Sequence, residues 1–354
     1  MMTAPARSSE ALIERLFASA NAAFDLFTIY IGERTGLYRV LADGSPRSST
    51  EVSQASGLDE RYVREWLEQQ AATGILEYKG GRFSLPEAFA AVLAHRDHPT
   101  YFAPLSRMMV ATAGKLPHVV EAFSSGAGIG WDEYGLDIIE GQSELNRPMF
   151  MHQLGQEYLP AVPEVHARLT RPGARVAEVG FGGGWASIGI ARAYPGVAVE
   201  GFDPDADSVR IATSNAAEHG LADRISFHGI DGARAAEFGK SFDLVCAFEC
   251  IHDMANPVAV LASMRKLAGQ DGAVLVMDER VADAFTGAAG EVEKFMYGWS
   301  VTACLPNGRA ESPSAATGTV LRTPILEGFA REAGFDSVET LPIENDFFKF
   351  YLLK

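Results

Sequence analysis

From residue 174 onward the chain alternates short apolar runs with helical patterns, and this alternation constrains the fold more than any other feature. Such runs are typical of strands in a parallel sheet that helices cover on both faces. The last two runs are joined by the short turn 344–346, which predicts an antiparallel pair at the end of the sheet. We expect seven strands within 174–180, 197–203, 224–229, 241–249, 272–279, 337–343 and 347–353.

A glycine-rich turn follows the first expected strand. Gly180, Gly182 and Gly184 occupy alternate positions in VAEVGFGGGW, just after Glu178. Glycine lets a backbone approach a ligand closely and adopt positive φ, and the N-terminus of the following helix favours an anionic group. We therefore expect a nucleotide-like ligand here, with a purely structural turn as the alternative. The dinucleotide pattern G-x-G-x-x-G fits poorly, because Trp185 occupies its sixth position.

Two acidic residues follow the next two strands. Asp203 ends the second strand, where a carboxylate can accept two hydrogen bonds from a ribose diol. Dinucleotide and adenosyl folds both place an acid there, so Asp203 alone does not separate them. Asp231 follows the third strand in FHGIDG. It either accepts a hydrogen bond from an adenine amino group or forms a turn.

Taken in order, these features resemble the class I S-adenosylmethionine-dependent methyltransferases over about residues 165–354. The resemblance rests on E-x-G-x-G-x-G at 178–184, the two acids, FDLVCAFECIHDM at 242–254 and the terminal antiparallel pair. The family often has Asp where this chain has Glu178. The resemblance implies an α/β fold with a Rossmann-like, seven-stranded methyltransferase sheet whose last strand is antiparallel. It also implies S-adenosyl-L-methionine as methyl donor and S-adenosyl-L-homocysteine as product.

The resemblance also assigns roles within the cofactor site. It gives the methionine part to Glu178 and the backbone of Gly180, Gly182 and Gly184. It gives the ribose to Asp203 and the adenine to Asp231. Phe248 and Glu249, at the end of the fourth strand, would flank the ligand.

A His-Asp pair follows the fourth strand. In this feature the chain is similar to the small-molecule O-methyltransferases of plants and bacterial natural-product pathways. By that resemblance His252 is the general base that deprotonates a hydroxyl acceptor, and a carboxylate after the fifth strand orients it. Asp278 and Glu279 both stand there, and we choose Glu279. The family's Trp after His-Asp is Met254 here. Many proteins of this fold carry a His at this position that is not a base, so a structural His252 stays an alternative.

The first hundred residues show a helix–turn–helix pattern followed by a two-stranded wing around Gly80–Gly81. A winged helix raises the alternative of a transcriptional regulator that senses S-adenosylmethionine. The second helix of the pattern, 59–73, holds four acidic residues and two arginines, and the whole chain has a net charge of −16. Because DNA affinity depends on Lys and Arg contacts to phosphates, we expect no nucleic-acid partner. The resemblance instead implies a homodimer formed through this domain.

We expect a helical winged-helix-like domain at 1–100, a helical linker at 101–165 and a methyltransferase domain at 166–354 with a lid at 281–320. A helix from about Glu144 to Leu159 would precede the catalytic domain. Four apolar, aromatic or imidazole side chains on this helix and in the lid would bind an acceptor, with plain core packing as the alternative. They are Phe150, His152, Met296 and Trp299.

The sequence also argues against a disulfide-rich protein, a metal site and a membrane-spanning protein. Three cysteines, Cys246, Cys250 and Cys304, do not make a disulfide framework, and no Cys or His set has zinc-site spacing, so we expect no metal. No run reaches the ~18–20 apolar residues of a membrane span. With no apolar leader at the start, we expect a cytoplasmic protein.

The sequence therefore predicts an S-adenosylmethionine-dependent methyltransferase acting on a small aromatic or apolar acceptor, at oxygen. N- or C-methylation, or another chemistry on the same fold, stays an alternative.

Overall fold

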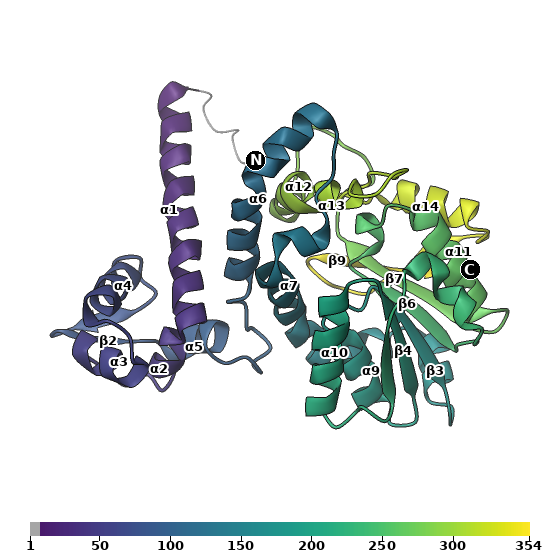
Figure 1. The fold of residues 1–354 in the computed structure, drawn as a ribbon, viewed down its shortest axis with the longest axis horizontal. Helices are drawn as coiled ribbons and strands as arrows, with labels where there is room; N and C mark the ends of the chain where they lie inside the picture. Colours follow the sequence, from purple (N-terminus) through teal and green to yellow (C-terminus); the bar gives the residue numbers. More distant parts are fainter. Residues whose placement is uncertain (1–7) are drawn as a thin grey trace. The chain divides into compact units, whose positions relative to one another are not determined.

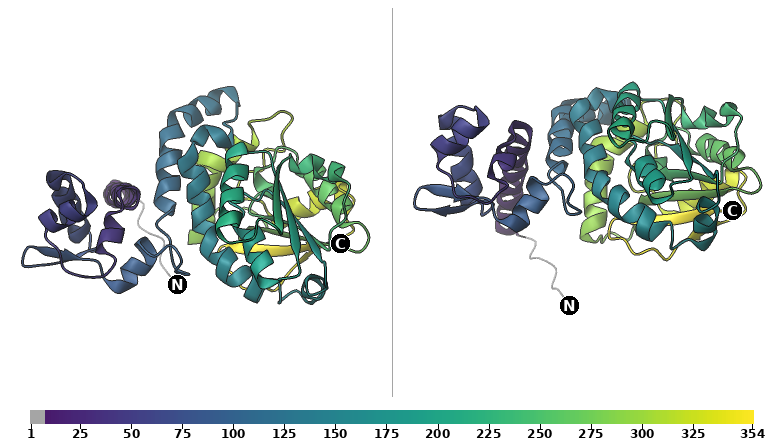
Figure 2. Two further views of the ribbon diagram at one scale, coloured as in Figure 1. Left: turned by 60° about the horizontal axis from the view of Figure 1, so that its bottom comes forward. Right: turned by 90° about the horizontal axis from the view of Figure 1, so that it is seen from below.

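The computed structural model describes residues 8–354, so the first seven residues of the predicted N-terminal domain lie outside the described part (Figures 1 and 2). The chain divides into two compact units, Met1–Val110 and Ala111–Lys354. Most of the segment predicted as a linker, 101–165, belongs to the second unit. The exact division into three parts stays a prediction.

The first unit has the helix–turn–helix and wing that the sequence predicts. Ser48 caps α3 in a capping box with Glu51, and Asp59 caps α4 by accepting hydrogen bonds from two backbone N–H groups of its first turn. Its core includes Tyr38 packed edge-on against Trp66, with ring centroids 5.1 Å apart. The elements are α1 (Ser9–Thr35), α2 (Leu37–Leu41), α3 (Ser49–Ser56), α4 (Glu60–Ala72), β1 (Glu77–Lys79), β2 (Arg82–Ser84) and α5 (Glu87–Leu93).

The second unit contains a seven-stranded sheet in the order β5-β4-β3-β6-β7-β9-β8. β9 pairs antiparallel with β7 and β8, and the other neighbouring strands are parallel. This confirms the predicted Rossmann-like sheet with an antiparallel last strand. The strands are β3 (Arg175–Val179), β4 (Ala198–Asp203), β5 (Ile225–Gly229), β6 (Leu244–Phe248), β7 (Ala273–Glu279), β8 (Val338–Thr340) and β9 (Phe348–Leu353).

Helices cover both faces of this sheet, as Figure 1 shows. One buried cluster packs α8 (Pro163–Leu169), α9 (Trp185–Ala193) and α10 (Ala206–Glu218) on one face. The other packs α11 (Pro257–Ala268) and α14 (Thr323–Glu332) on the opposite face. Because neighbouring residues of a strand point to opposite faces, both sets of alternate positions are apolar, which explains the continuous apolar runs in the sequence.

A long helix precedes the sheet. It begins at Leu136, earlier than the predicted Glu144, as α7 (Leu136–Met149), and continues as the π-helical segment η2 (Phe150–Tyr158). Gly141 is buried within α7, where packing outweighs its poor helix propensity. The helix α6 (Leu105–Ser125) and the short turn η1 (Trp131–Tyr134) come before it.

The predicted lid segment is helical in its middle. It forms α12 (Glu291–Trp299), the π-helical η5 (Ser300–Cys304) and α13 (Leu305–Gly308). Tyr134 Oη donates to Thr302 O at 2.9 Å, and Ala315 N donates to Ala255 O at 2.8 Å. The first bond ties the segment to η1, and the second ties it to the loop that follows η4 (Ile251–Asp253), the short turn after β6. Within residues 8–354, no helix combines the length and apolar character that a membrane span needs.

Candidate active site

The residues singled out in the sequence gather at one edge of the sheet. β3, β4, β6 and β7 are parallel neighbours, so their carboxyl ends lie side by side. In open α/β sheets this edge is where ligands bind. It brings together Glu178, Asp203, Glu249, His252 and Glu279, which come from four different strand ends.

The glycine loop needs its glycines for more than one reason. Gly180, Gly182 and Gly184 all have positive φ, at 71°, 49° and 75°. A Cβ on Gly180 would lie 2.7 Å from Cys250 Sγ, and one on Gly184 would lie 2.6 Å from the Phe227 ring. A Cβ on Gly182 would meet nothing within 4 Å. The protein itself therefore excludes side chains at Gly180 and Gly184, and the loop is open only at Gly182.

Asp203 holds this loop from the neighbouring strand. Its Oδ2 accepts a hydrogen bond from Gly182 N at 3.1 Å, and its Oδ1 accepts one from Asp205 N at 3.0 Å. Burial raises the pKa of Asp203 to about 6, although the two backbone bonds oppose the shift. The side chain therefore fixes the open part of the loop in addition to any ligand contact.

Glu178 lies beneath the loop. Only 2% of it is exposed, and its carboxylate accepts a hydrogen bond from the Ser187 hydroxyl in the first turns of α9. Burial raises the pKa of Glu178 to about 7. At neutral pH this carboxyl group is thus divided between its charged and neutral forms.

Asp231 has a structural partner of its own. Its side chain is exposed, and its Oδ1 accepts a hydrogen bond from Ala233 N at 2.9 Å, which caps η3 (Gly232–Phe238). The turn-forming alternative therefore holds in the structure. Contact with an adenine stays a prediction.

Glu249 takes an unusual backbone conformation at the end of β6. Its φ is +57°, which non-glycine residues rarely adopt and which often marks a functional site. Asn146 of α7 donates a hydrogen bond to its carboxylate. Burial raises the pKa of Glu249 to about 7, against the opposing effects of His252 and Asn146. The preceding residue, Phe248, packs against Phe150 with ring centroids 5.8 Å apart.

His252 is oriented by Asp278, which corrects the choice of Glu279. His252 Nδ1 lies 2.9 Å from Asp278 Oδ1, and the two residues are 2% and 0% exposed. Alternation along β7 explains the outcome. Val274 and Val276 pack in the same cluster as Ile251 of η4, so Asp278 points to that face, whereas Met277 packs on the opposite one.

Glu279 is buried on its own. It is 3% exposed, and its Oε2 has no hydrogen-bond partner among residues 8–354. Burial and the nearby charge of Glu249 raise its pKa well above the usual range. The shift favours the neutral form of Glu279, and the carboxylate that contacts His252 Nδ1 is that of Asp278.

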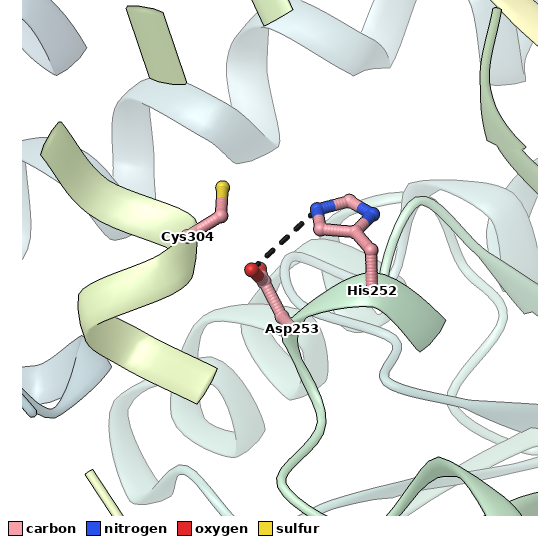
Figure 3. Close-up of side chains that lie close together, drawn as sticks. All are labelled: His252, Asp253 and Cys304. Carbon is pink, nitrogen blue, oxygen red and sulfur yellow. Dashed lines mark ion pairs between the residues drawn. The ribbon is translucent and has the colours of Figure 1, made fainter. Parts of the chain in front are cut away.

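The other nitrogen of His252 faces two further groups. Its Nε2 lies 3.5 Å from Asp253 Oδ1, and the Cys304 thiol of η5 approaches from the other side (Figure 3). Burial lowers the pKa of His252, but the carboxylates of Asp278 and Asp253 outweigh it and raise that pKa well above its usual value. The shift therefore favours the protonated imidazole in the ligand-free chain.

The predicted acceptor residues lie in two places. Phe150 and His152 are on η2, and Phe150 reaches the cofactor side through its contact with Phe248. Met296 is 4% exposed within α12, and Trp299 is half-buried with its ring edge-on to Phe295 at 5.7 Å. A common acceptor pocket formed by the two pairs stays a prediction.

One polar face of α7 was not predicted from the sequence. Ser143 Oγ is buried without a hydrogen-bond partner in the described chain, and it lies 1.7 Å from where a Cβ on Gly183 would stand. On the same face Asn146 holds Glu249, and the Arg147 guanidinium stacks 4.8 Å from the centroid of the Trp185 ring. The i, i+3, i+4 spacing of Ser143, Asn146 and Arg147 was the signal that could have revealed this face.

Comparisons with known proteins agree with this geometry. Residues 22–95 match the family described as "Rv2258c-like winged HTH domain", and residues 170–320 match "Methyltransferase domain". The ubiquinone biosynthesis O-methyltransferase of Ralstonia nicotianae is 30% identical over 49% of this chain and 67% of its own length. The same enzyme of Agrobacterium fabrum is 30% identical over 31% of this chain, which spans only 42% of that relative.

A solved structure resembles the chain throughout. An O-methyltransferase family protein from Burkholderia thailandensis has a TM-score of 0.72, at 18% identity, and the likeness covers 99% of this chain and 98% of that one. At that identity the likeness establishes the fold alone. Together with the sequence relatives and the arrangement of the sheet edge, it leads to one conclusion. The chain belongs to the class I S-adenosylmethionine-dependent methyltransferases, with a winged-helix domain before the methyltransferase domain.

Proposed function

We propose that this protein transfers the methyl group of S-adenosylmethionine to a hydroxyl group of a small, aromatic or apolar molecule. The observation that carries the proposal is the buried His252–Asp278 pair, which lies at the same sheet edge as the glycine loop. A hydroxyl is a poor nucleophile until it loses its proton, and a positioned imidazole is a common base for that step.

The residues of the loop fit the cofactor. The space in front of Gly182 is open, Asp203 stands beside it, and Ser143 Oγ is a buried hydroxyl without a partner in residues 8–354. Glu178 and the loop backbone would hold the methionine part, Asp203 the ribose and Asp231 the adenine. Phe248 and Glu249 would flank the ligand. When bound, the cofactor supplies a methyl group attached to a sulfonium sulfur, which departs from the methyl carbon as a neutral thioether.

His252 would accept the acceptor's proton at Nε2. Asp278 fixes the ring by binding Nδ1, and its carboxylate stabilises the imidazolium that forms. Because the pKa of His252 is raised, the neutral base becomes more abundant as the pH rises. General-base assistance of this kind is typically worth about 10²–10⁴-fold in rate.

The winged-helix unit supports a dimer better than a DNA-binding role. On α4, Arg61 pairs with Glu65, and Arg64 lies 3.7 Å from Glu60, so an acidic side chain beside each arginine offsets the positive charge that phosphate contacts need. On α1 a row of large apolar side chains is exposed, and burying it in a second copy would be favourable. These side chains are Leu12, Ile13, Leu16, Phe17, Phe24, Phe27 and Ile31. We therefore propose a homodimer formed through this unit.

The test is a methyl-transfer screen with labelled S-adenosylmethionine. Pairs of flat aromatic acceptors that differ only in carrying a hydroxyl or an amino group would be compared. We expect label on the hydroxyl member, and a fall in rate of about 10²–10⁴-fold in His252→Ala. Transfer to the amino member alone, or full activity in His252→Ala, would contradict the proposal.

A further inference from the structure

Glu249 stands at the end of β6, the strand between the glycine loop and the carboxylate that orients His252. β6 pairs with β3, which leads into the loop, and with β7, which carries Asp278. Glu249 N donates to Met277 O at 2.7 Å, so the pairing with β7 continues to this residue. A ligand that reaches from the loop to His252 therefore passes the end of β6.

The Glu249 side chain is fixed in place and still accessible. Its backbone has a φ of +57°, a conformation that clusters at functional sites, and its carboxylate accepts a hydrogen bond from Asn146 of α7. Gln142, one helical turn before Asn146, also donates to this carboxylate. Whereas Glu178 and Glu279 are only 2% and 3% exposed, Glu249 keeps part of its surface exposed. A ligand in the site can therefore contact it.

The same face of α7 carries a second group that indicates a ligand. Ser143 is 8% exposed, and its Oγ has no hydrogen-bond partner among residues 8–354. The hydroxyl lies against the glycine loop, since a Cβ on Gly183 would stand 1.7 Å from it. Ser143 and Asn146 are three residues apart, so one side of α7 reaches from the loop to Glu249. A buried hydroxyl without a partner is costly unless a ligand completes it.

The charges around Glu249 leave room for a cation when His252 acts as base. Glu249 faces His252 of η4 and the carboxyl groups of Asp278 and Glu279 on β7. In the ligand-free chain the protonated imidazole is the neighbouring positive charge, and it opposes the effect of burial on the pKa of Glu249. As a base, His252 must be neutral. Glu249 then lacks a counter-charge, which is costly for a carboxylate in a desolvated site.

We propose that the carboxylate of Glu249 is the counter-charge of the sulfonium of bound S-adenosylmethionine. The inference rests on the proposed function, which places this cofactor in front of the glycine loop. Methyl transfer needs the donor sulfur, the methyl carbon and the acceptor oxygen in line, with that oxygen within reach of His252 Nε2. The sulfur therefore lies between the loop and His252, where Glu249 stands. The same positive charge disfavours the imidazolium and so favours the neutral base.

Glu249 would act on cofactor binding more than on the chemical step. The charge on sulfur is complete before the transfer and disperses as the methyl group leaves, so a facing carboxylate stabilises the bound donor more than the transition state. Such an interaction tightens binding without raising the rate of the bound complex. S-adenosylhomocysteine has a neutral sulfur, and the carboxylate gives it no such advantage. Glu249 therefore selects the charged donor over the spent product.

The test is a pair of calorimetric titrations of the full chain, one with S-adenosylmethionine and one with S-adenosylhomocysteine. The two ligands differ only in the methyl group and the charge on sulfur, so the ratio of their Kd values isolates that charge. Glu249→Gln keeps the size of the side chain and should weaken binding of the charged ligand relative to the neutral one by about tenfold. The matched control is Glu279→Gln, which changes a neighbouring carboxyl group whose neutral form is favoured, and it should leave the ratio unchanged.

An unchanged ratio in Glu249→Gln, or an equal change in Glu279→Gln, would overturn the inference. Melting curves identify a variant that has lost its fold. If Glu249→Gln does, Asn146→Ala replaces it. Loss of the hydrogen bond that favours the carboxylate should then shift the ratio in the same direction by roughly threefold, and an unchanged ratio would refute the role of Glu249. If the proposed function itself is wrong, the wild-type chain binds neither ligand. If only the role of Glu249 is wrong, both ligands bind and their ratio does not respond to the variant.

Discussion

Exchanging Asp278 for Asn should reveal how much the protein depends on the buried pair. The change keeps the size of the side chain but removes the charge that faces His252 Nδ1 at 2.9 Å. Both residues are almost fully buried, so water screens the interaction little. A hydrogen bond to a charged group is worth about 1.5–3 kcal/mol.

That loss translates into a measurable melting shift. For a unit of this size, each kcal/mol lowers the Tm by about 2–4 °C, so Asp278→Asn should melt about 3–12 °C below the wild type. Glu279→Gln is the matched control on the next residue. Burial favours the protonated form of Glu279, and an amide resembles a protonated carboxyl group, so we expect a loss of less than about 1 kcal/mol.

The shift should depend on pH in a defined direction. The folded pKa of His252 is raised, so its stabilising contribution is complete below the unfolded value of about 6.5 and is lost as the pH rises through the folded value. The difference in Tm between wild type and Asp278→Asn should therefore be largest below about pH 6.5 and shrink at higher pH. In activity assays, the variant's acidic limb should move to lower pH.

The assay is differential scanning calorimetry of both variants from pH 5.5 to 9, together with their pH–rate profiles. If Asp278→Asn matches the wild type while Glu279→Gln loses stability, the original choice of Glu279 as the orienting carboxylate would be restored. A pH-independent Tm difference would show that the contribution of Asp278 does not pass through the charge of His252.

Three further expectations can be checked with single variants. Burial raises the pKa of Glu178 to about 7, so its ionisation costs stability as the pH rises above about 4.5; the free energy of unfolding of Glu178→Gln should exceed that of the wild type at pH 8 by up to about 3 kcal/mol, and not at pH 4, as measured by denaturant unfolding. Trp299→Ala should raise the KM for the acceptor while leaving the Kd for S-adenosylhomocysteine unchanged, and the reverse pattern in steady-state kinetics and calorimetry would remove Trp299 from the acceptor site. Light scattering should give twice the 38.1 kDa chain mass for the wild type. Phe17→Glu, on the exposed row of α1, should reduce the measured mass to that of a single chain.

The positions of the strands along the chain and of the glycine loop could be predicted because they depend on local patterns. Buried parallel strands are apolar on both faces, and a tight turn with positive φ selects glycine, so both leave a direct trace in the sequence. The reason for each glycine could not be predicted. Gly184 is required by the Phe227 ring from a different strand, which no local pattern reveals.

Choices between adjacent residues depended on tertiary packing. Asp278 and Glu279 are both acids at the end of β7, and only the face on which η4 packs decides which one meets His252. The approach of Cys304 was hidden for the same reason, because it follows from how η5 is held through the hydrogen bond from Tyr134 to Thr302. Linear spacing between cysteines and histidines cannot report contacts of this kind.

The most direct test of the central claim is a calorimetric titration of the full chain with S-adenosylhomocysteine, set beside the same titration of Asp203→Ala. We predict saturable binding at one site per chain, and a clear loss of affinity in the variant because Asp203 supports Gly182 and would, as proposed, bind the ribose. No heat with this ligand, together with tight binding of a nicotinamide dinucleotide, would contradict the account.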